Sequence, residues 1–184
     1  MANKNGNRGL ADPISIKPFG KDDDLVKVIV ETPKDSNNKY AFDPEERIFT
    51  LKKVLPAGMS FPYDFGFVPR TEAEDGDPLD VLIFMDQPAY PGVLLKCRLI
   101  GLLEGEQTEK NGKAVRNDRL LAVEQGSHTY AHLKHVKDVL QRLLDELGEF
   151  FANYHKLEGS EYKTLGIKGP SGARKKLANT KAAA

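Results

Sequence analysis

The chain has 184 residues, of which 40% are hydrophobic and 29% are charged, and its 27 basic and 27 acidic residues give a formal net charge of zero. This length fits one domain, and the balanced charge argues against a general nucleic-acid binder, which usually carries a basic excess. There is no membrane-length apolar run, no signal-peptide pattern at the N-terminus and only one cysteine, Cys97, so we expect a cytoplasmic protein.

Residues 1–20 are polar and are expected to form a surface arm or a flexible end. After them, short segments rich in β-branched and aromatic residues alternate with turn signals made of Gly, Pro, Asn and Asp. The predicted strands are residues 26–31, 39–42, 47–54, 65–69, 79–84, 93–103 and 120–123. Many short strands at this spacing indicate a barrel or a sandwich.

One helix is predicted near the end of the chain, because apolar residues from Val139 to Tyr154 recur at three- and four-residue steps. Such a stripe needs a surface to cover, and the β unit supplies one. We therefore predict an α+β, mainly β domain over residues 1–168, a small barrel with packed C-terminal helices. Residues 169–184 are small and basic and are expected to be a flexible tail.

Three aspartates, Asp75, Asp77 and Asp80, fall within six residues, immediately before the apolar run VLIF. Carboxylates this close repel one another, and each pKa rises unless a cation lies between them. Mg²⁺ is a hard cation that takes oxygen ligands of this kind. The alternative is a solvated acidic turn in which Asp75-Gly76 only forms a hairpin. The spacing alone leaves both interpretations open.

The segment DGDPLDV, residues 75–81, resembles the signature D-x-D-P-x-D-V of the family I soluble inorganic pyrophosphatases. Other segments resemble the family in the same order, among them FPYDFGFVPRT, PGVLLKCRLIGLLE, HVKDV and FFANYHKLEG. The resemblance covers about residues 25–165. It implies an OB-like five-stranded β-barrel, a homo-oligomer, and Mg²⁺-dependent hydrolysis of inorganic pyrophosphate to two phosphates by a metal-activated water. The partner it implies is this small-molecule substrate, with no nucleic acid and no membrane.

The resemblance also implies roles for single residues. The metal ligands would be Asp75, Asp77, Asp80 and Glu31, with Asp80 as the central ligand. The catalytic residues would be Asp77 as the base, together with Asp80 and Lys39. The substrate-binding residues would be Lys39, Lys53, Arg119, Tyr154 and His155.

Several positions depart from the family pattern. Ala41, Gln107 and Asn117 stand where the family has carboxylates, and Phe61 and Phe65 replace two tyrosines. Three changes exchange one cationic or potentially cationic side chain for another. Lys53 stands where the family has arginine, and Arg119 and His155 stand where the family has lysine. A slip of one residue in the alignment would bring Asp118 or Glu106 into the site instead.

On the simplest alignment three carboxylates are lost, so we expect one or two Mg²⁺ ions rather than a full multi-metal cluster. Two alternatives follow from the altered positions. One is a hydrolase of another phosphoanhydride, such as a nucleotide or a polyphosphate. The other is a catalytically impaired paralogue that acts as a binding or assembly subunit.

Overall fold

The computed structural model describes residues 12–19, 24–108 and 111–181. The first part of the expected N-terminal arm, residues 1–11, and residues 182–184 of the expected tail lie outside the described residues. The rest of the arm contains the short 3-10 helix η1, Pro13–Ser15, and Phe19 forms an isolated bridge with Val26. No helix in the described part of the chain has the length and apolar character needed to cross a membrane.

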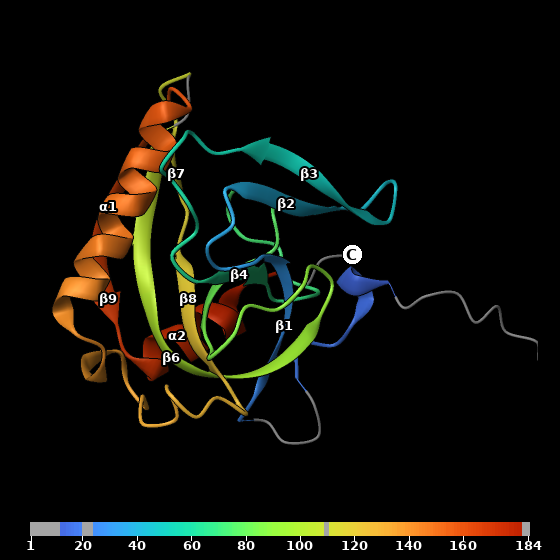
Figure 1. Cartoon of the computed structure of the whole chain (residues 1–184), viewed down its shortest axis with the longest axis vertical. Coiled ribbons are helices and arrows are strands. Elements are labelled where there is room, and N and C mark those ends of the chain that lie inside the picture. Colours follow the sequence, from blue (N-terminus) through green and yellow to red (C-terminus); the bar gives the residue numbers. More distant parts are fainter. Residues whose placement is uncertain (1–11, 20–23, 109–110, 182–184) are drawn as a thin grey trace, which may run out of the picture.

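The centre of the molecule is a closed ring of five strands (Figure 1). The described part of the chain contains nine strands in all: β1 (Val26–Thr32), β2 (Asn38–Asp43), β3 (Ile48–Val54), β4 (Asp64–Phe67), β5 (Asp80–Phe84), β6 (Leu94–Thr108), β7 (Ala114–Arg116), β8 (Arg119–Glu124) and β9 (Glu161–Lys168). The ring runs β1-β4-β5-β8-β6 and closes because β6 also pairs with β1. Only β5 and β8 pair in parallel; the other neighbours in the ring are antiparallel. The prediction of a five-stranded OB-like barrel is confirmed.

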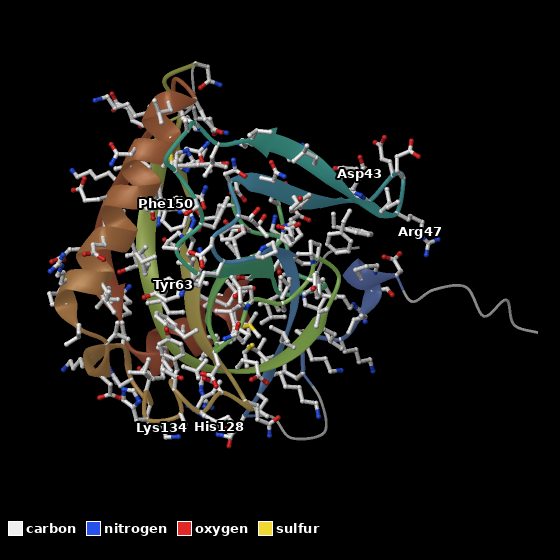
Figure 2. The ribbon with its side chains drawn as sticks, viewed as in Figure 1. Asp43, Arg47, Tyr63, His128, Lys134 and Phe150 are labelled. Carbon is white, nitrogen blue, oxygen red and sulfur yellow. The ribbon has the colours of Figure 1, made fainter. Side chains whose placement is uncertain are left out.

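Two features extend the barrel. The strand β6 is long enough to leave the ring and pair with β7 and β9, two strands that the sequence patterns did not indicate. The strands β2 and β3 form a separate hairpin, and Figure 2 shows Asp43 and Arg47 near its far end, away from the barrel. Gly66 permits the close approach of β4 to β1, since a Cβ atom there would lie 2.1 Å from the Ile29 carbonyl oxygen.

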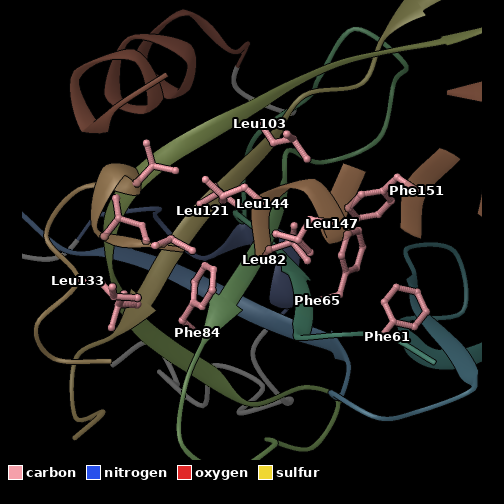
Figure 3. Packing of buried hydrophobic residues seen from close by; sticks show 14 of the residues in the cluster. Phe61, Phe65, Leu82, Phe84, Leu103, Leu121, Leu133, Leu144, Leu147 and Phe151 are labelled. Atoms are coloured by element: carbon pink, nitrogen blue, oxygen red, sulfur yellow. The ribbon is translucent and has the colours of Figure 1, made fainter. Parts of the chain in front are cut away.

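The helix α1 (Gln141–Leu157) packs along one side of the barrel, where the apolar stripe predicted it. Its buried residues Leu144, Leu147 and Phe151 join a core cluster that includes Phe61 and Phe65 (Figure 3). Leu140, which the stripe included, precedes the helix and is exposed. His135 caps the short 3-10 helix η2 (Val136–Asp138) that comes before it.

The prediction of a flexible tail from residue 169 onward is wrong for its helical part. Helix α2 (Pro170–Asn179) begins with a proline at a position where no backbone N–H is needed. Its buried residues Ala173 and Leu177 belong to a second core cluster, which also contains Leu99 and Leu102 of β6. Burial of these two side chains holds the segment on the barrel, although its sequence is small and basic.

Candidate active site

All nine residues that the resemblance assigned to a site line one cavity of about 690 Å³. They come from β1, the β2–β3 hairpin, the loop before β5, the start of β8 and the end of α1. The nine are Glu31, Lys39, Lys53, Asp75, Asp77, Asp80, Arg119, Tyr154 and His155. Barrel closure therefore gathers segments that are far apart in the sequence.

The acidic loop, residues 75–80, is shaped by its own backbone. Gly76 has a φ of 90°, a conformation that favours glycine. The Asp77 amide donates to Asp75 Oδ1 at 3.2 Å, and the Ala73 amide donates to the Asp77 carbonyl at 2.7 Å. Asp80 is then the first residue of β5, where pairing with Phe67 of β4 fixes its direction.

Glu31 reaches the cavity because of an irregularity in β1. Val30 pairs with Gly66 and Thr32 pairs with Phe65, so Glu31 is an extra residue between two successive partners. Such a bulge re-aims a side chain. Its Oε1 atom accepts a hydrogen bond of 2.9 Å from the Phe42 amide, which ties β1 to the β2–β3 hairpin.

Three carboxylates of the cavity, Glu31, Asp75 and Asp80, hold protons more tightly than usual. Burial raises the pKa of Glu31 to about 7, with a further increase from Asp80 and Asp77. Burial likewise raises the pKa of Asp80 to about 6, although Arg119 and Lys39 oppose the change. The pKa of Asp75 is raised as well, chiefly by burial.

These raised pKa values mark carboxylates whose negative charge is not fully compensated, the condition that a divalent cation relieves. Among the residues that the structure describes, no three His, Cys, Asp or Glu side chains form a ready-made metal cage. The donor set nevertheless suits Mg²⁺, which binds a few carboxylates and keeps several waters. Glu31, Asp75, Asp77 and Asp80 are the residues that fit it.

Positive charge enters the same cavity from the β2–β3 hairpin. Lys39 and Lys53 are direct Cα partners across the two strands, and their ammonium groups lie 5.8 Å and 4.5 Å from the ring centroid of Tyr154. Lys53 also pairs with Glu158 at the end of α1. Burial lowers the pKa of Lys53, and the charge of Lys39 adds to that decrease, whereas Glu158 opposes it.

Arg119 packs against two neighbouring aromatic rings. Its guanidinium carbon lies 3.8 Å from the ring centroid of Phe151 and 4.7 Å from that of Tyr162. Its Nε atom lies 3.7 Å from Asp80 Oδ2 and has no hydrogen-bond partner within the described part of the chain. The side chain is only 4% exposed, so this charge is fixed and largely removed from water.

His155 stands where the resemblance implies a lysine, but it does not supply a lysine's positive charge. Its ring stacks on Tyr162 with an interplanar angle of 15°. Burial lowers the pKa of His155 to about 3, and the nearby charges of Arg119, Lys39 and Lys53 lower it further. The imidazole is therefore neutral at physiological pH and can contribute a hydrogen bond but no positive charge.

The altered positions divide into two groups. Ala41, Gln107 and Asn117 line the cavity, and Nδ2 of the Asn117 side chain donates to Gln107 Oε1 at 2.8 Å. Asp118, which a slip of the alignment would have recruited, instead pairs with Arg116 and Lys176 and does not line this cavity. Glu106, the other residue named for such a slip, does not line this cavity either. Phe61 and Phe65 are buried in the core and do not line the cavity, and the Lys39 ammonium lies 5.5 Å from the ring centroid of Phe65.

Three residues around the cavity were missed by sequence reasoning. Glu158 pairs with Lys53, and Phe151 and Tyr162 pack against Arg119. Phe151 and Glu158 stand in the segment FFANYHKLEG, which resembles the family, but the resemblance assigned neither of them a role. Nothing in the sequence around Tyr162 distinguishes it from a core residue.

Comparisons with known proteins agree with this arrangement. Residues 28–184 match the family model described as inorganic pyrophosphatase. An inorganic pyrophosphatase from Synechocystis sp. is 40% identical over 144 residues, which cover 78% of this chain and 82% of that protein. The crystal structure of inorganic pyrophosphatase from Thermus thermophilus superposes with a TM-score of 0.83 at 32% identity, covering 91% and 95% of the two chains. A structure from Neisseria gonorrhoeae gives a TM-score of 0.81 at 27% identity, with coverage of 90% and 94%.

Proposed function

The chain belongs to the inorganic pyrophosphatase family, and we propose that it hydrolyses inorganic pyrophosphate to two phosphates in a Mg²⁺-dependent reaction. The observation that carries the proposal is the shared cavity of about 690 Å³, in which Glu31 and the acidic-loop aspartates lie together with Lys39, Lys53 and Arg119. Pyrophosphate carries several negative charges, so it needs both the cationic side chains and a cation held by the carboxylates.

Glu31, Asp75, Asp77 and Asp80 would hold Mg²⁺, with Asp80 as the central ligand. When bound, Mg²⁺ supplies Lewis-acid chemistry, because it neutralises phosphate charge and makes coordinated water more acidic. Ala41, Gln107 and Asn117 contribute no negative charge, which supports one or two ions rather than a larger cluster.

The other residues would bind and orient the substrate. Lys39, Lys53 and Arg119 would neutralise phosphate oxygens, and their charges would stabilise the phosphate that leaves when the bridging P–O bond breaks. Tyr154 and the neutral His155 would offer hydrogen bonds at the floor of the cavity. Asp77 would accept the proton of the attacking water as the new P–O bond forms.

The experiment is phosphate release from pyrophosphate by the purified protein, measured over a range of Mg²⁺ concentrations beside an Asp80→Asn variant. We expect fast, Mg²⁺-dependent release that the variant lacks. Release that is equal in the two proteins would remove the acidic loop from the mechanism.

A panel of nucleotides and polyphosphates in the same assay addresses the second candidate function. The specific observation behind it is the neutral His155 in place of a charged lysine, which lowers the positive charge available to a small, highly charged substrate. A longer phosphoanhydride as the best substrate would favour this candidate. No turnover of any member of the panel would favour a binding or assembly subunit.

Two further expectations belong to this proposal. The family resemblance supports a homo-oligomer, to be checked by light scattering of the purified protein. The single cysteine, Cys97, is buried, and a chain that uses no disulfide suits the cytoplasm.

A further inference from the structure

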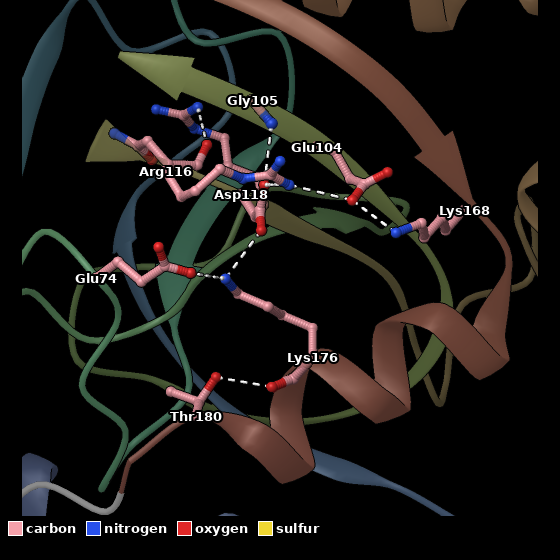
Figure 4. Close-up of polar contacts among 10 residues, drawn as sticks. Glu74, Glu104, Gly105, Arg116, Asp118, Lys168, Lys176 and Thr180 are labelled. Carbon is pink, nitrogen blue, oxygen red and sulfur yellow. Dashed lines mark hydrogen bonds and ion pairs between the residues drawn. The ribbon is translucent and has the colours of Figure 1, made fainter. Parts of the chain in front are cut away.

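A network of ion pairs joins the C-terminal helix to the acidic loop from outside the cavity (Figure 4). Lys176 of α2 is its centre. The Lys176 Nζ atom lies 2.8 Å from Asp118 Oδ2 and 3.2 Å from Glu74 Oε1. Its side chain is only 17% exposed, and the Asp118 side chain is 3% exposed, so the Lys176–Asp118 pair is largely shielded from solvent screening.

The helix holds Lys176 in a fixed place. Its neighbour Leu177 and, one turn earlier, Ala173 are buried in the core cluster that includes β6. Gly172 allows α2 to lie close to β9, since a Cβ atom there would be 2.6 Å from the Lys168 Cβ atom. At the end of the helix, the Thr180 hydroxyl donates to the Lys176 carbonyl at 2.8 Å. Lys176 is therefore carried by a docked helix and not by a free tail.

On the other side of the network, the segment that leads into the acidic loop is attached at two points. Glu74, the partner of Lys176, directly precedes Asp75. Two residues earlier, the Glu72 amide donates to the Lys181 carbonyl at 2.9 Å, in an isolated bridge just after α2. Between these points, Ala73 is hydrogen-bonded to the Asp77 carbonyl. The position of the loop carboxylates is thus linked to the position of α2.

The second partner of Lys176 connects to the cationic side of the cavity. Asp118 lies between Asn117 and Arg119, both of which line the cavity. Its Oδ1 atom accepts from the Gly105 amide at 3.0 Å and pairs with Arg116 at 2.7 Å, which fixes the chain where β8 begins. Lys176 therefore lies outside the cavity but contacts Glu74 and Asp118. These two residues are the sequence neighbours of Asp75 and Arg119, which line the cavity.

We propose that Lys176 is a positioning residue that holds the acidic loop in register with the start of β8, so that the loop carboxylates bind Mg²⁺ with full affinity. The proposal rests on the metal role given to the acidic loop under the proposed function. Residues that orient ligands from behind commonly change metal affinity by about 10-fold to 100-fold. Lys176 acts through Glu74 and does not touch a metal ligand directly, so an effect of about tenfold is expected.

The primary measurement is calorimetric titration of Mg²⁺ into the full chain without substrate, for the wild type and for Lys176→Met. We expect the dissociation constant of Mg²⁺ to rise by about tenfold, and Lys176→Arg to restore most of the affinity because it keeps the charge. In pyrophosphate hydrolysis, the half-saturating Mg²⁺ concentration should rise by a similar factor. The turnover number at saturating Mg²⁺ should change by less than about twofold, because only the positioning of the loop is lost.

Arg174→Met is the matched control, since Arg174 lies on the same helix and its ion pair with Asp24 is exposed on both sides. It should leave the Mg²⁺ affinity unchanged. A Lys176→Met protein that folds and binds Mg²⁺ as tightly as the wild type would overturn the proposal. If that variant does not fold, Glu74→Gln breaks only the loop half of the network, and an unchanged Mg²⁺ affinity in Glu74→Gln would overturn the proposal equally.

Asp80→Asn in the same titration separates this inference from the proposed function. Loss of Mg²⁺ binding in Asp80→Asn together with wild-type binding in Lys176→Met would reject the positioning role alone. Wild-type binding in Asp80→Asn would instead reject the metal site itself.

Discussion

Lys39 and Lys53 face each other across the β2–β3 hairpin as direct Cα partners, and both ammonium groups lie near the ring of Tyr154. Like charges placed directly opposite in a sheet are destabilising. Glu158 relieves part of this repulsion through its contact with Lys53. The remaining repulsion between the two ammonium groups favours binding of an anion, which would neutralise their positive charge.

We expect Lys39→Met to lower kcat/KM for pyrophosphate by about 10-fold to 100-fold, because one charge-assisted contact with phosphate is lost. The free energy of unfolding should stay within about 0.5 kcal/mol of the wild type or increase, since the repulsion with Lys53 disappears. Steady-state kinetics and urea unfolding measure the two effects. The matched control is Lys27→Met, because Lys27 and Lys96 form a second pair of facing lysines outside the cavity. A large loss of activity in this control would contradict the assignment.

Arg119→Lys introduces the residue that the resemblance implies at this position, yet we expect it to reduce kcat/KM by about 10-fold or more. The guanidinium carbon lies 3.8 Å and 4.7 Å from the ring centroids of Phe151 and Tyr162, whereas an ammonium group lacks the planar face that packs on such rings and is more strongly hydrated. Steady-state kinetics measures the effect. Arg98→Lys serves as control, since Arg98 donates to the Ala131 and Leu133 carbonyls away from the cavity. Full activity in Arg119→Lys would show that charge alone is required.

Asn117→Asp should raise the affinity for Mg²⁺ by about tenfold, because it adds a carboxylate at a position that lines the same cavity as the acidic loop. Without metal, the same variant should be less stable by about 1–3 kcal/mol. Asn117 is buried, and the change removes its hydrogen bond to Gln107. Calorimetric titration and thermal unfolding in EDTA test the two parts. Asn153→Asp adds the same charge on the exposed face of α1 and should affect neither; an equal rise in affinity there would indicate a general charge effect.

The raised pKa of Glu31 predicts a pH dependence of stability with a defined sign. In the folded protein without metal this pKa is about 7, compared with an ordinary value of 4.5. The folded state therefore binds the proton more tightly than the unfolded state. The stability that Glu31 contributes is fully present below pH 4.5 and is lost as the pH rises through about 7.

Glu31→Gln should remove this dependence. Relative to the wild type, the variant should gain on the order of 2 kcal/mol between about pH 4.5 and pH 8 in EDTA, which urea unfolding at several pH values measures. With saturating Mg²⁺ the wild type should be the more stable of the two proteins, because metal binding then stabilises its folded state and the variant has lost a ligand. The same gain in Glu45→Gln, at an exposed residue of the hairpin turn, would show that Glu31 is not the cause.

The sequence by itself determined the parts of this protein that are encoded locally. Asp75, Asp77 and Asp80 lie within one short loop, so their convergence required no knowledge of distant contacts. The alternating strands and the apolar stripe of α1 follow from the periodicities of two and 3.6 residues. The family signature then connected these elements to a barrel and to a phosphoanhydride substrate.

Only the tertiary structure decided how Glu31 and the cationic residues are brought to the acidic loop. Three features depend on pairing and packing between distant segments. They are the bulge at Glu31, the facing pair Lys39 and Lys53, and the aromatic rings against Arg119. Helix α2 was missed for the same reason: a ten-residue helix with few apolar positions is marginal alone, and docking of Ala173 and Leu177 on the barrel stabilises it. Long-range burial, which no local pattern records, thus placed Lys176 behind the acidic loop.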